Sequence, residues 1–247
     1  MNRLEIFEKR STAHYETSVP HISVDCVVFG FHASSLKVLL VKMKDGPWGL
    51  PGGYLKKTED LEDAAQRILN ERTGAENIFL EQFKTFGKQF RSESALDFLP
   101  EGFWQKQRFV SVGFYALVEY STIVPRVDEM SEACEWKDVE EMPELMMDHG
   151  DIFRAALSAL HKQINYKPIG YNLLPKEFTL PQLQKLYEII LGKKLYRGSF
   201  QRRILGYDIL IRHNKTMKIG AHRSPILYSF DLEKYNAAME EGLVRGW

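Results

Sequence analysis

Residues 52–75 of this chain read G-G-Y-L-K-K-T-E-D-L-E-D-A-A-Q-R-I-L-N-E-R-T-G-A, and this stretch decides the fold. Residues 61–72 contain neither Gly nor Pro, and their apolar side chains recur at Leu61, Ala64, Ala65, Ile68 and Leu69. That spacing predicts an amphipathic helix. Positions 68, 71 and 72 are three and four apart, so they are expected on one face of the helix.

Seven residues of this stretch stand at the fixed offsets of a known motif, and the stretch resembles a Nudix box. That pattern is Gly, five residues, Glu, seven residues, then Arg-Glu-aliphatic-x-Glu-Glu-x-Gly-aliphatic. The matching residues are Gly53, Glu59, Arg67, Leu69, Glu71, Gly74 and Ala75. Two positions depart, because Ile68 and Arg72 stand where the box has glutamates. The resemblance implies that the glutamates of the motif hold a divalent metal against a diphosphate.

The two departures argue against a metal site. Magnesium prefers hard oxygen ligands in a near-octahedral array, and a phosphate-transfer site uses the ion to stabilise negative charge. Ile68 offers a hydrocarbon and Arg72 a cation. Glu59 and Glu71 remain, but Glu71 can pair with Arg67 four positions before it. We therefore expect no metal, no other cofactor and no enzymatic activity. The alternative is a Nudix hydrolase for a nucleoside diphosphate derivative, in which outer carboxylates restore the metal site.

Composition agrees with a globular protein of one large or two smaller domains. The chain has 247 residues, of which 44% are hydrophobic, and no apolar run reaches the length of a membrane span. Residues 1–23 are charged and lack the apolar segment of a signal peptide. The two cysteines, Cys26 and Cys134, lie in apolar contexts, as expected of buried thiols in a reducing compartment. These features predict a cytoplasmic protein without a membrane partner.

Charge is distributed unevenly along the chain although its net value is zero. Residues 167–247 contain 14 Lys and Arg against 7 Asp and Glu, whereas residues 1–166 contain 19 against 26. The net charges are therefore +7 and −7. This asymmetry is typical of a nucleic-acid-binding part joined to a part that does not bind nucleic acid.

The first half of the chain is expected to be an α/β domain. Strands are predicted at residues 21–31, 36–43, 77–87, 108–120 and 133–139, and a late helix is predicted at 151–166. This order resembles a Nudix α/β/α sandwich over residues 21–166. Residues 88–107 form a longer insertion that contains Phe90, Phe98, Phe103 and Trp104.

Four residues of this half are candidates for an effector site: Asp25, Lys42, Trp48 and Arg108. A flat aromatic ring and hydrogen-bonding groups suit a polyol. Asp25 interrupts an apolar strand, so its carboxylate either accepts backbone hydrogen bonds or faces a ligand. Structural roles remain open for all four.

The second half has the outline of a winged helix-turn-helix. Thr179 and Gln182 have the spacing of a capping box, and Gly192 is expected to end the helix that follows. A second helix is predicted at residues 199–206, with Phe200, Ile204 and Leu205 facing inward. Two strands, at 209–212 and 226–230, flank a basic loop.

Basic residues gather on the second helix and on the loop. Arg202 and Arg203, or Gln201, are expected to reach base edges. The remaining DNA-binding candidates are Ser199 and the phosphate-binding residues Lys194, Arg197, Lys215, Lys218 and Arg223. The alternative is a winged helix that docks on protein and carries a solvated basic face.

Together the halves resemble the Nudix-related transcriptional regulators, in which a degenerate Nudix domain precedes a winged helix. The resemblance is carried by Asp148-His149 and by residues 169–176, 178–188 and 198–205, and it is strongest to the sugar-responsive branch, which includes arabinose-responsive repressors. It implies a homodimer on a palindromic double-stranded DNA operator, released by a small effector, here a sugar or sugar derivative. A regulator that senses ADP-ribose or a nucleotide sugar is the alternative.

The expected division is an N-terminal arm (1–20), an effector-binding domain (21–166), a connector (167–178) and a DNA-binding domain (179–247). The effector-binding and DNA-binding domains are expected to have separate apolar cores.

Overall fold

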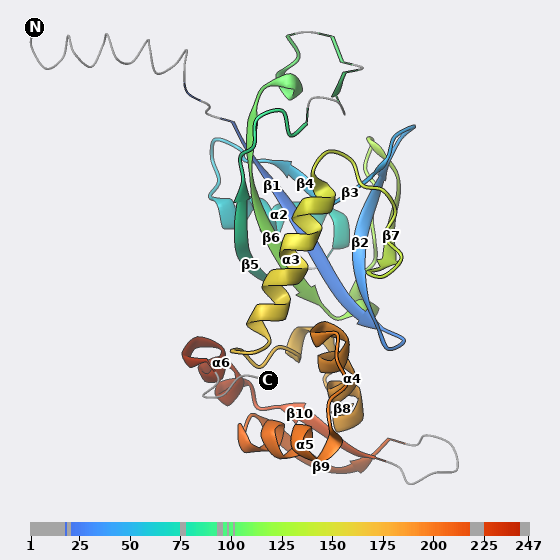
Figure 1. Ribbon diagram of the computed structural model, residues 1–247, viewed down its shortest axis with the longest axis vertical. Helices are drawn as coiled ribbons and strands as arrows, with labels where there is room; N and C mark the ends of the chain where they lie inside the picture. Colours follow the sequence, from blue (N-terminus) through green and yellow to red (C-terminus); the bar gives the residue numbers. More distant parts are fainter. Residues whose placement is uncertain are drawn as a thin grey trace, which may run out of the picture.

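A computed structural model describes residues 18, 21–74, 78–92, 96–97, 99–100, 102–217 and 225–242. Its upper part in Figure 1 is a sheet with helices on its faces, and its lower part is a smaller helical unit with a short sheet. The longer helix α3 (His149–Gln163) runs down the sheet and ends beside the lower unit (Figure 1). None of the helices among these residues is long and apolar enough to cross a membrane.

The first half forms a 7-stranded mixed sheet around the central strand β1 (His21–His32). β1 pairs in parallel with β6 (Phe109–Val118) and antiparallel with β2 (Ser35–Met43). Its other strands are β3 (Trp48–Gly49), β4 (Gly52–Tyr54), β5 (Phe79–Phe86) and β7 (Ser131–Asp138). The expected longer strands are confirmed with small shifts of their ends, whereas the short β3 and β4 were not predicted.

Helices α2 (Leu61–Thr73) and α3 cover opposite faces of this sheet. Successive side chains of a strand point to opposite faces. Val24, Cys26 and Val28 of β1 accordingly pack in the cluster that contains Ile68 of α2, whereas Val27 and Phe29 pack in the cluster that contains α3. The α/β/α sandwich is therefore confirmed, and α2 is the helix expected from the box.

The second half is a winged helix. A 3-stranded sheet in the order β8-β10-β9 packs with α4 and α5. The capping box of Thr179 and Gln182 is present at the start of α4, and Gly192 ends α4 in the left-handed conformation with φ of 62°. The elements are β8 (Phe178–Thr179), α4 (Leu180–Leu191), α5 (Arg197–Gly206), β9 (Leu210–Thr216), β10 (Ile226–Phe230) and α6 (Leu232–Glu241).

Two details of this half differ from the sequence prediction. Leu205 is 45% exposed, so only Phe200 and Ile204 of the three expected side chains face inward along α5. Helix α6 was not predicted, because only Tyr235 of its residues is buried and its apolar pattern is short.

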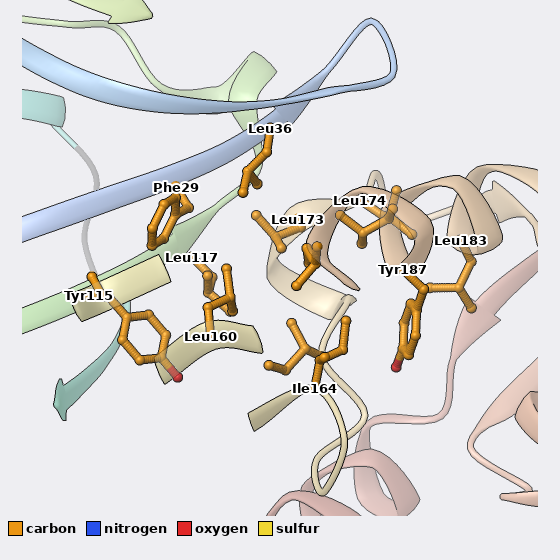
Figure 2. Close-up of a cluster of buried hydrophobic side chains, with 14 of the residues drawn as sticks. Phe29, Leu36, Tyr115, Leu117, Leu160, Ile164, Leu173, Leu174, Leu183 and Tyr187 are labelled. Atoms are coloured by element: carbon orange, nitrogen blue, oxygen red, sulfur yellow. The ribbon is translucent and has the colours of Figure 1, made fainter. Parts of the chain in front are cut away.

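The two halves share one apolar core, which contradicts the expected separate cores. Leu160 and Ile164, at and just beyond the end of α3, lie in one buried cluster with Leu183 and Tyr187 of α4. Figure 2 shows Leu173 and Leu174 between these two groups. The connector therefore contributes side chains to the core, through its short helix η4 (Tyr171–Leu173) and the residue after it.

Candidate functional site

The carboxylates that remain in the Nudix box are held by one arginine. Arg67 donates two hydrogen bonds to Glu59, from Nε at 2.9 Å and from Nη2 at 2.7 Å, and its Nη1 lies 3.4 Å from Oε1 of Glu71. The backbone N–H of Lys56 also donates to Glu59. These hydrogen bonds lower the pKa of Glu59 to about 2, and those from Arg67 have the largest effect. The oxygens of Glu59 are therefore occupied by donors.

The two residues that depart from the motif are integrated into the structure. Ile68 is 2% exposed and fits beneath Gly53, where an added Cβ would stand 3.1 Å from its Cδ1. Arg72 forms an ion pair with Asp128 at 2.5 Å and donates to the hydroxyl of Ser131 at 3.3 Å. Burial raises the pKa of Asp128, but the hydrogen bonds from Arg72 and Ser131 prevail and lower it to about 2.

This donor set does not fit a divalent metal. Within the parts of the chain that the structure describes, no group of three or more His, Cys, Asp or Glu side chains could hold such an ion. The hydrocarbon at 68 and the cation at 72 stand where the motif would present oxygens, and Arg67 already holds the remaining carboxylates.

Of the four predicted effector residues, the structure brings only Lys42 and Trp48 together. Lys42 of β2 is opposite Trp48 of β3, and Trp48 also receives the ammonium of Lys137 over its ring at 4.4 Å. Arg108 is exposed and donates to the carbonyl of Gly87 at 3.1 Å. Asp25 is buried on β1 and contacts none of the other three in any described interaction.

Asp25 instead belongs to a buried polar group, here called the Arg91 cluster: Asp25, Arg91, Ser111, Asp148 and His149. Arg91 binds Asp148 through two hydrogen bonds, Nε–Oδ2 at 2.8 Å and Nη2–Oδ1 at 2.7 Å, and its Nη2 lies 3.4 Å from Oδ2 of Asp25. The hydroxyl of Ser111 donates to Asp25 at 2.5 Å. The Asp25 carboxylate thus bonds to side chains, which neither alternative had included.

A backbone hydrogen bond beside the Arg91 cluster determines which ring nitrogen of His149 carries the proton. The backbone N–H of Leu50 donates to Nδ1 of His149 at 2.9 Å, so Nδ1 is an acceptor and the ring proton is on Nε2. That Nε2 lies 3.6 Å from Oδ1 of Asp25. Gly52 is required beside this carboxylate, because an added Cβ would stand 2.6 Å from the same Oδ1. Arg91 therefore supplies the positive charge between the carboxylates of Asp25 and Asp148.

Sequence reasoning missed this cluster because its members are distant along the chain. Arg91 and Asp25 are separated by 66 positions, and Arg91 and Asp148 by 57. The adjacent pair Asp148-His149 was noticed only as part of a family resemblance. No local periodicity connects these residues, so a sequence pattern alone offers no signal for Arg91.

A group of aromatic rings lies at the start of β1, and we call it the aromatic surface. Trp104 contacts Tyr54 at 4.5 Å between ring centroids, Phe109 at 4.8 Å and His21 at 5.7 Å. Trp104 and Tyr54 are 46% and 41% exposed. Arg67 donates to the carbonyl of Tyr54 at 3.0 Å, so the box lies beside these rings. Trp104 belongs to the insertion, in the short helix η2 (Trp104–Lys106).

The DNA-binding candidates lie on α5 and around it. Arg197, Ser199 and Arg202 are exposed, whereas Gln201 and Arg203 are half-buried on the same helix. Lys194 lies 3.4 Å from Glu188, and Lys215 on β9 lies 3.6 Å from Glu177. Both lysine side chains are largely exposed, so these ion pairs are screened by solvent. Lys218 and Arg223 lie outside the residues that the structure describes.

Comparisons with known proteins agree with this two-part architecture. Residues 19–156 match the Nudix domain, and residues 170–230 match the NrtR DNA-binding winged helix domain. An ADPR responsive transcriptional repressor, NtrR of Acinetobacter baylyi, is 31% identical over 240 residues, covering 93% of this chain and 90% of its own length.

Solved structures show the same arrangement. Shewanella oneidensis NrtR complexed with a 27mer DNA is 28% identical, with a TM-score of 0.76, and the match covers 92% of this chain and 99% of the other. A MutT/nudix family protein from Enterococcus faecalis, 19% identical, shares the fold with a TM-score of 0.67 over 94% of this chain and 99% of its own. The chain belongs to the NrtR family of transcriptional regulators, in which a Nudix domain precedes a DNA-binding winged helix.

Proposed function

We propose that this protein is a cytoplasmic transcriptional repressor whose Nudix domain binds ADP-ribose without hydrolysing it, and whose winged helix binds an operator. The observation that carries the proposal is the state of the box, where Arg67 holds Glu59 and Glu71 and where Ile68 and Arg72 replace the other carboxylates. A diphosphate is hydrolysed in the family with the help of a metal, and these residues do not fit one.

The aromatic surface supports ADP-ribose as the effector. An adenine ring stacks favourably on aromatic side chains, and Tyr54 and Trp104 expose large parts of theirs. The Acinetobacter relative is described as ADPR responsive. The expected sugar or arabinose effector has no comparable support. The ring of Trp48 is covered by the ammonium of Lys137, and the ammonium of Lys42 donates to the carbonyl of Gly46. ADP-ribose, the alternative in the sequence analysis, is therefore the better assignment.

Titration calorimetry tests the effector. We expect ADP-ribose to bind with the same affinity in EDTA and in magnesium, and arabinose not to bind. Incubation with magnesium or manganese should yield no AMP, whereas turnover near 1 per second or more would identify an enzyme. ADP-ribose at about a hundred times its dissociation constant should stabilise the fold by about 2.7 kcal/mol. Binding that requires the metal would contradict the proposal.

The DNA-binding part of the proposal assigns α5 to the major groove. Arg202 and Arg203, or Gln201, contact bases, while Ser199, Lys194, Arg197, Lys215, Lys218 and Arg223 contact the backbone. A homodimer would place two such helices on half-sites about 10 base pairs apart, or a multiple of that spacing. The exposed positions of Arg197 and Arg202 support this assignment.

Two substitutions separate base reading from phosphate binding. Arg203→Ala should cost about 1–3 kcal/mol on the operator and little on random DNA. Lys215→Ala should weaken all sequences alike and reduce the log–log salt slope by about one per subunit. Lys162→Ala, on the exposed side of α3, is the matched control and should change neither. Equal loss on operator and random DNA for Arg203→Ala would overturn the assignment of the reading face.

A further inference from the structure

We propose that Arg91 is a positioning residue that couples effector binding to DNA release, through its contact with the amino end of α3. The inference rests on the proposed function, since it explains how an effector at the aromatic surface would change the winged helix. Arg91 is not part of the Nudix motif, and it touches neither that surface nor the winged helix in any described contact.

The first step is that Arg91 ties the insertion to α3. Its side chain is 6% exposed and lies between Asp25 at 8% and Asp148 at 16%. Asp148 is the N-cap residue of α3, and His149 is the first residue of that helix. A paired arginine–carboxylate contact with two parallel hydrogen bonds is strong and specific in direction. The insertion is therefore attached to the helix through one guanidinium.

The second step is that α3 connects this contact to the winged helix. The helix has 15 residues, which corresponds to a length of about 22 Å. Its far end packs Leu160, and Ile164 just beyond it, in the shared core with Tyr187 of α4 (Figure 2). Cores are densely packed, so a displaced helix requires its neighbours to move. A shift of α3 is thus transmitted to the connector and to α4.

The third step is that the effector must move the insertion. Trp104 and Tyr54 meet edge to face with centroids 4.5 Å apart, so a base that enters between the two rings has to displace Trp104. Trp104 and Arg91 belong to the same insertion between β5 and β6. In the proposed coupling, displacement of Trp104 weakens the contact between Arg91 and Asp148, and the effector-bound state is the one in which that contact is broken.

Coupling is measured as the ratio of operator dissociation constants with and without saturating ADP-ribose. Wild type should show a ratio of about 5–150, the usual range for allosteric proteins. Arg91→Gln should reduce the ratio to below about 3, because its operator affinity without ADP-ribose falls toward that of the effector-bound wild type, while ADP-ribose still binds. Arg154→Gln is the matched control, because Arg154 is an arginine of α3 with its side chain 69% exposed. It should keep the wild-type ratio.

Two results for Arg91→Gln would contradict the coupling role. An unchanged ratio in Arg91→Gln would overturn the proposal, and so would loss of ADP-ribose binding, which would make Arg91 a ligand-binding residue. If Arg91→Gln does not fold, Asp148→Asn removes the same ion pair with little change of shape and should lower the ratio in the same way. The double variant should then be no worse than either single variant.

Hydrogen exchange keeps the inference testable if wild type does not bind ADP-ribose, in which case the proposed function fails. In Arg91→Gln without any ligand, amides of Ile152–Leu160 and of residues 169–174 should exchange faster than in wild type, and those of α2 should not. Faster exchange confined to the neighbourhood of positions 91 and 148 would show that α3 transmits nothing, and would overturn the coupling role.

Discussion

The two ends of α3 are held by different forces. At the amino end, Asp148 and His149 belong to the Arg91 cluster, where two carboxylates share one guanidinium. At the carboxyl end, Leu160 and Ile164 are fully buried among hydrocarbon side chains of the connector and α4. The first contact depends on direction and on a single partner, whereas the second depends on buried area and tolerates small displacements.

This difference suggests a division of roles along one helix. A charge contact has a bound and a broken state, so it suits a position that responds to a ligand. An apolar contact is strong without being directional, so it suits a position that transmits a displacement. The predictions below challenge this comparison, beginning with the largest expected effect.

Removing the cation from the Arg91 cluster should give the largest loss of stability. Arg91→Met leaves the carboxylates of Asp25 and Asp148 buried without their shared cation, and this should lower the free energy of unfolding by about 3–5 kcal/mol. Urea denaturation measures it. Arg154→Met, an exposed change on α3, should stay within about 0.5 kcal/mol of wild type. A loss below about 1 kcal/mol for Arg91→Met would mean that water already screens the cluster.

Shortening a side chain at the other end should cost less. Leu160→Ala creates a cavity in the shared core and should lower the free energy of unfolding by about 3 kcal/mol. Because both halves share this core, a single calorimetric transition is expected, shifted as a whole. Two separate transitions, with only one of them shifted, would show that the two halves unfold independently. The loss should not vary with salt.

The half-buried ion pair of the box, Arg67 with Glu59, supplies the smallest effect. Arg67 holds the pKa of Glu59 at about 2, so this pair stabilises the fold at neutral pH and loses its contribution as pH falls from about 4.5 to about 2. In Arg67→Met the pKa should return toward its usual 4.5. Carboxyl carbon NMR of Glu59 measures it. A value that stays near 2 would assign the shift to the Lys56 backbone N–H.

Local features of the fold were predictable from the sequence. Thr179, Gln182 and Gly192 set both ends of α4 by contacts within a few residues, and the helix of the box follows from spacing alone. Helix α6 has such a signal too, because Asp231 caps it by accepting from the backbone N–H of Lys234. Because Tyr235 is the one buried residue of α6, the helix has no apolar pattern that would support the cap.

The candidate site was less predictable. Ile68 and Arg72 could be identified as departures from a motif, but their partners, Gly53 and Asp128, follow only from the fold. Asp25 was singled out because its carboxylate interrupts an apolar strand. Its partner Arg91 comes from the insertion, and burial brings the two together without any local pattern. Likewise, Leu173 and Leu174 were read as part of a connector because nothing in their neighbourhood shows which surfaces they cover.

The shared core constrains how this regulator can be recombined. A chimaera that joins residues 21–166 to the winged helix of another protein would expose the hydrocarbon surface around Leu160 and Ile164, unless the new partner presents side chains of matching shape. Evolution and protein engineers face the same restriction. The operator preference proposed for α5 would be exchangeable by surface substitutions, whereas the exchange of whole modules has to carry the connector and the inner face of α4 with it.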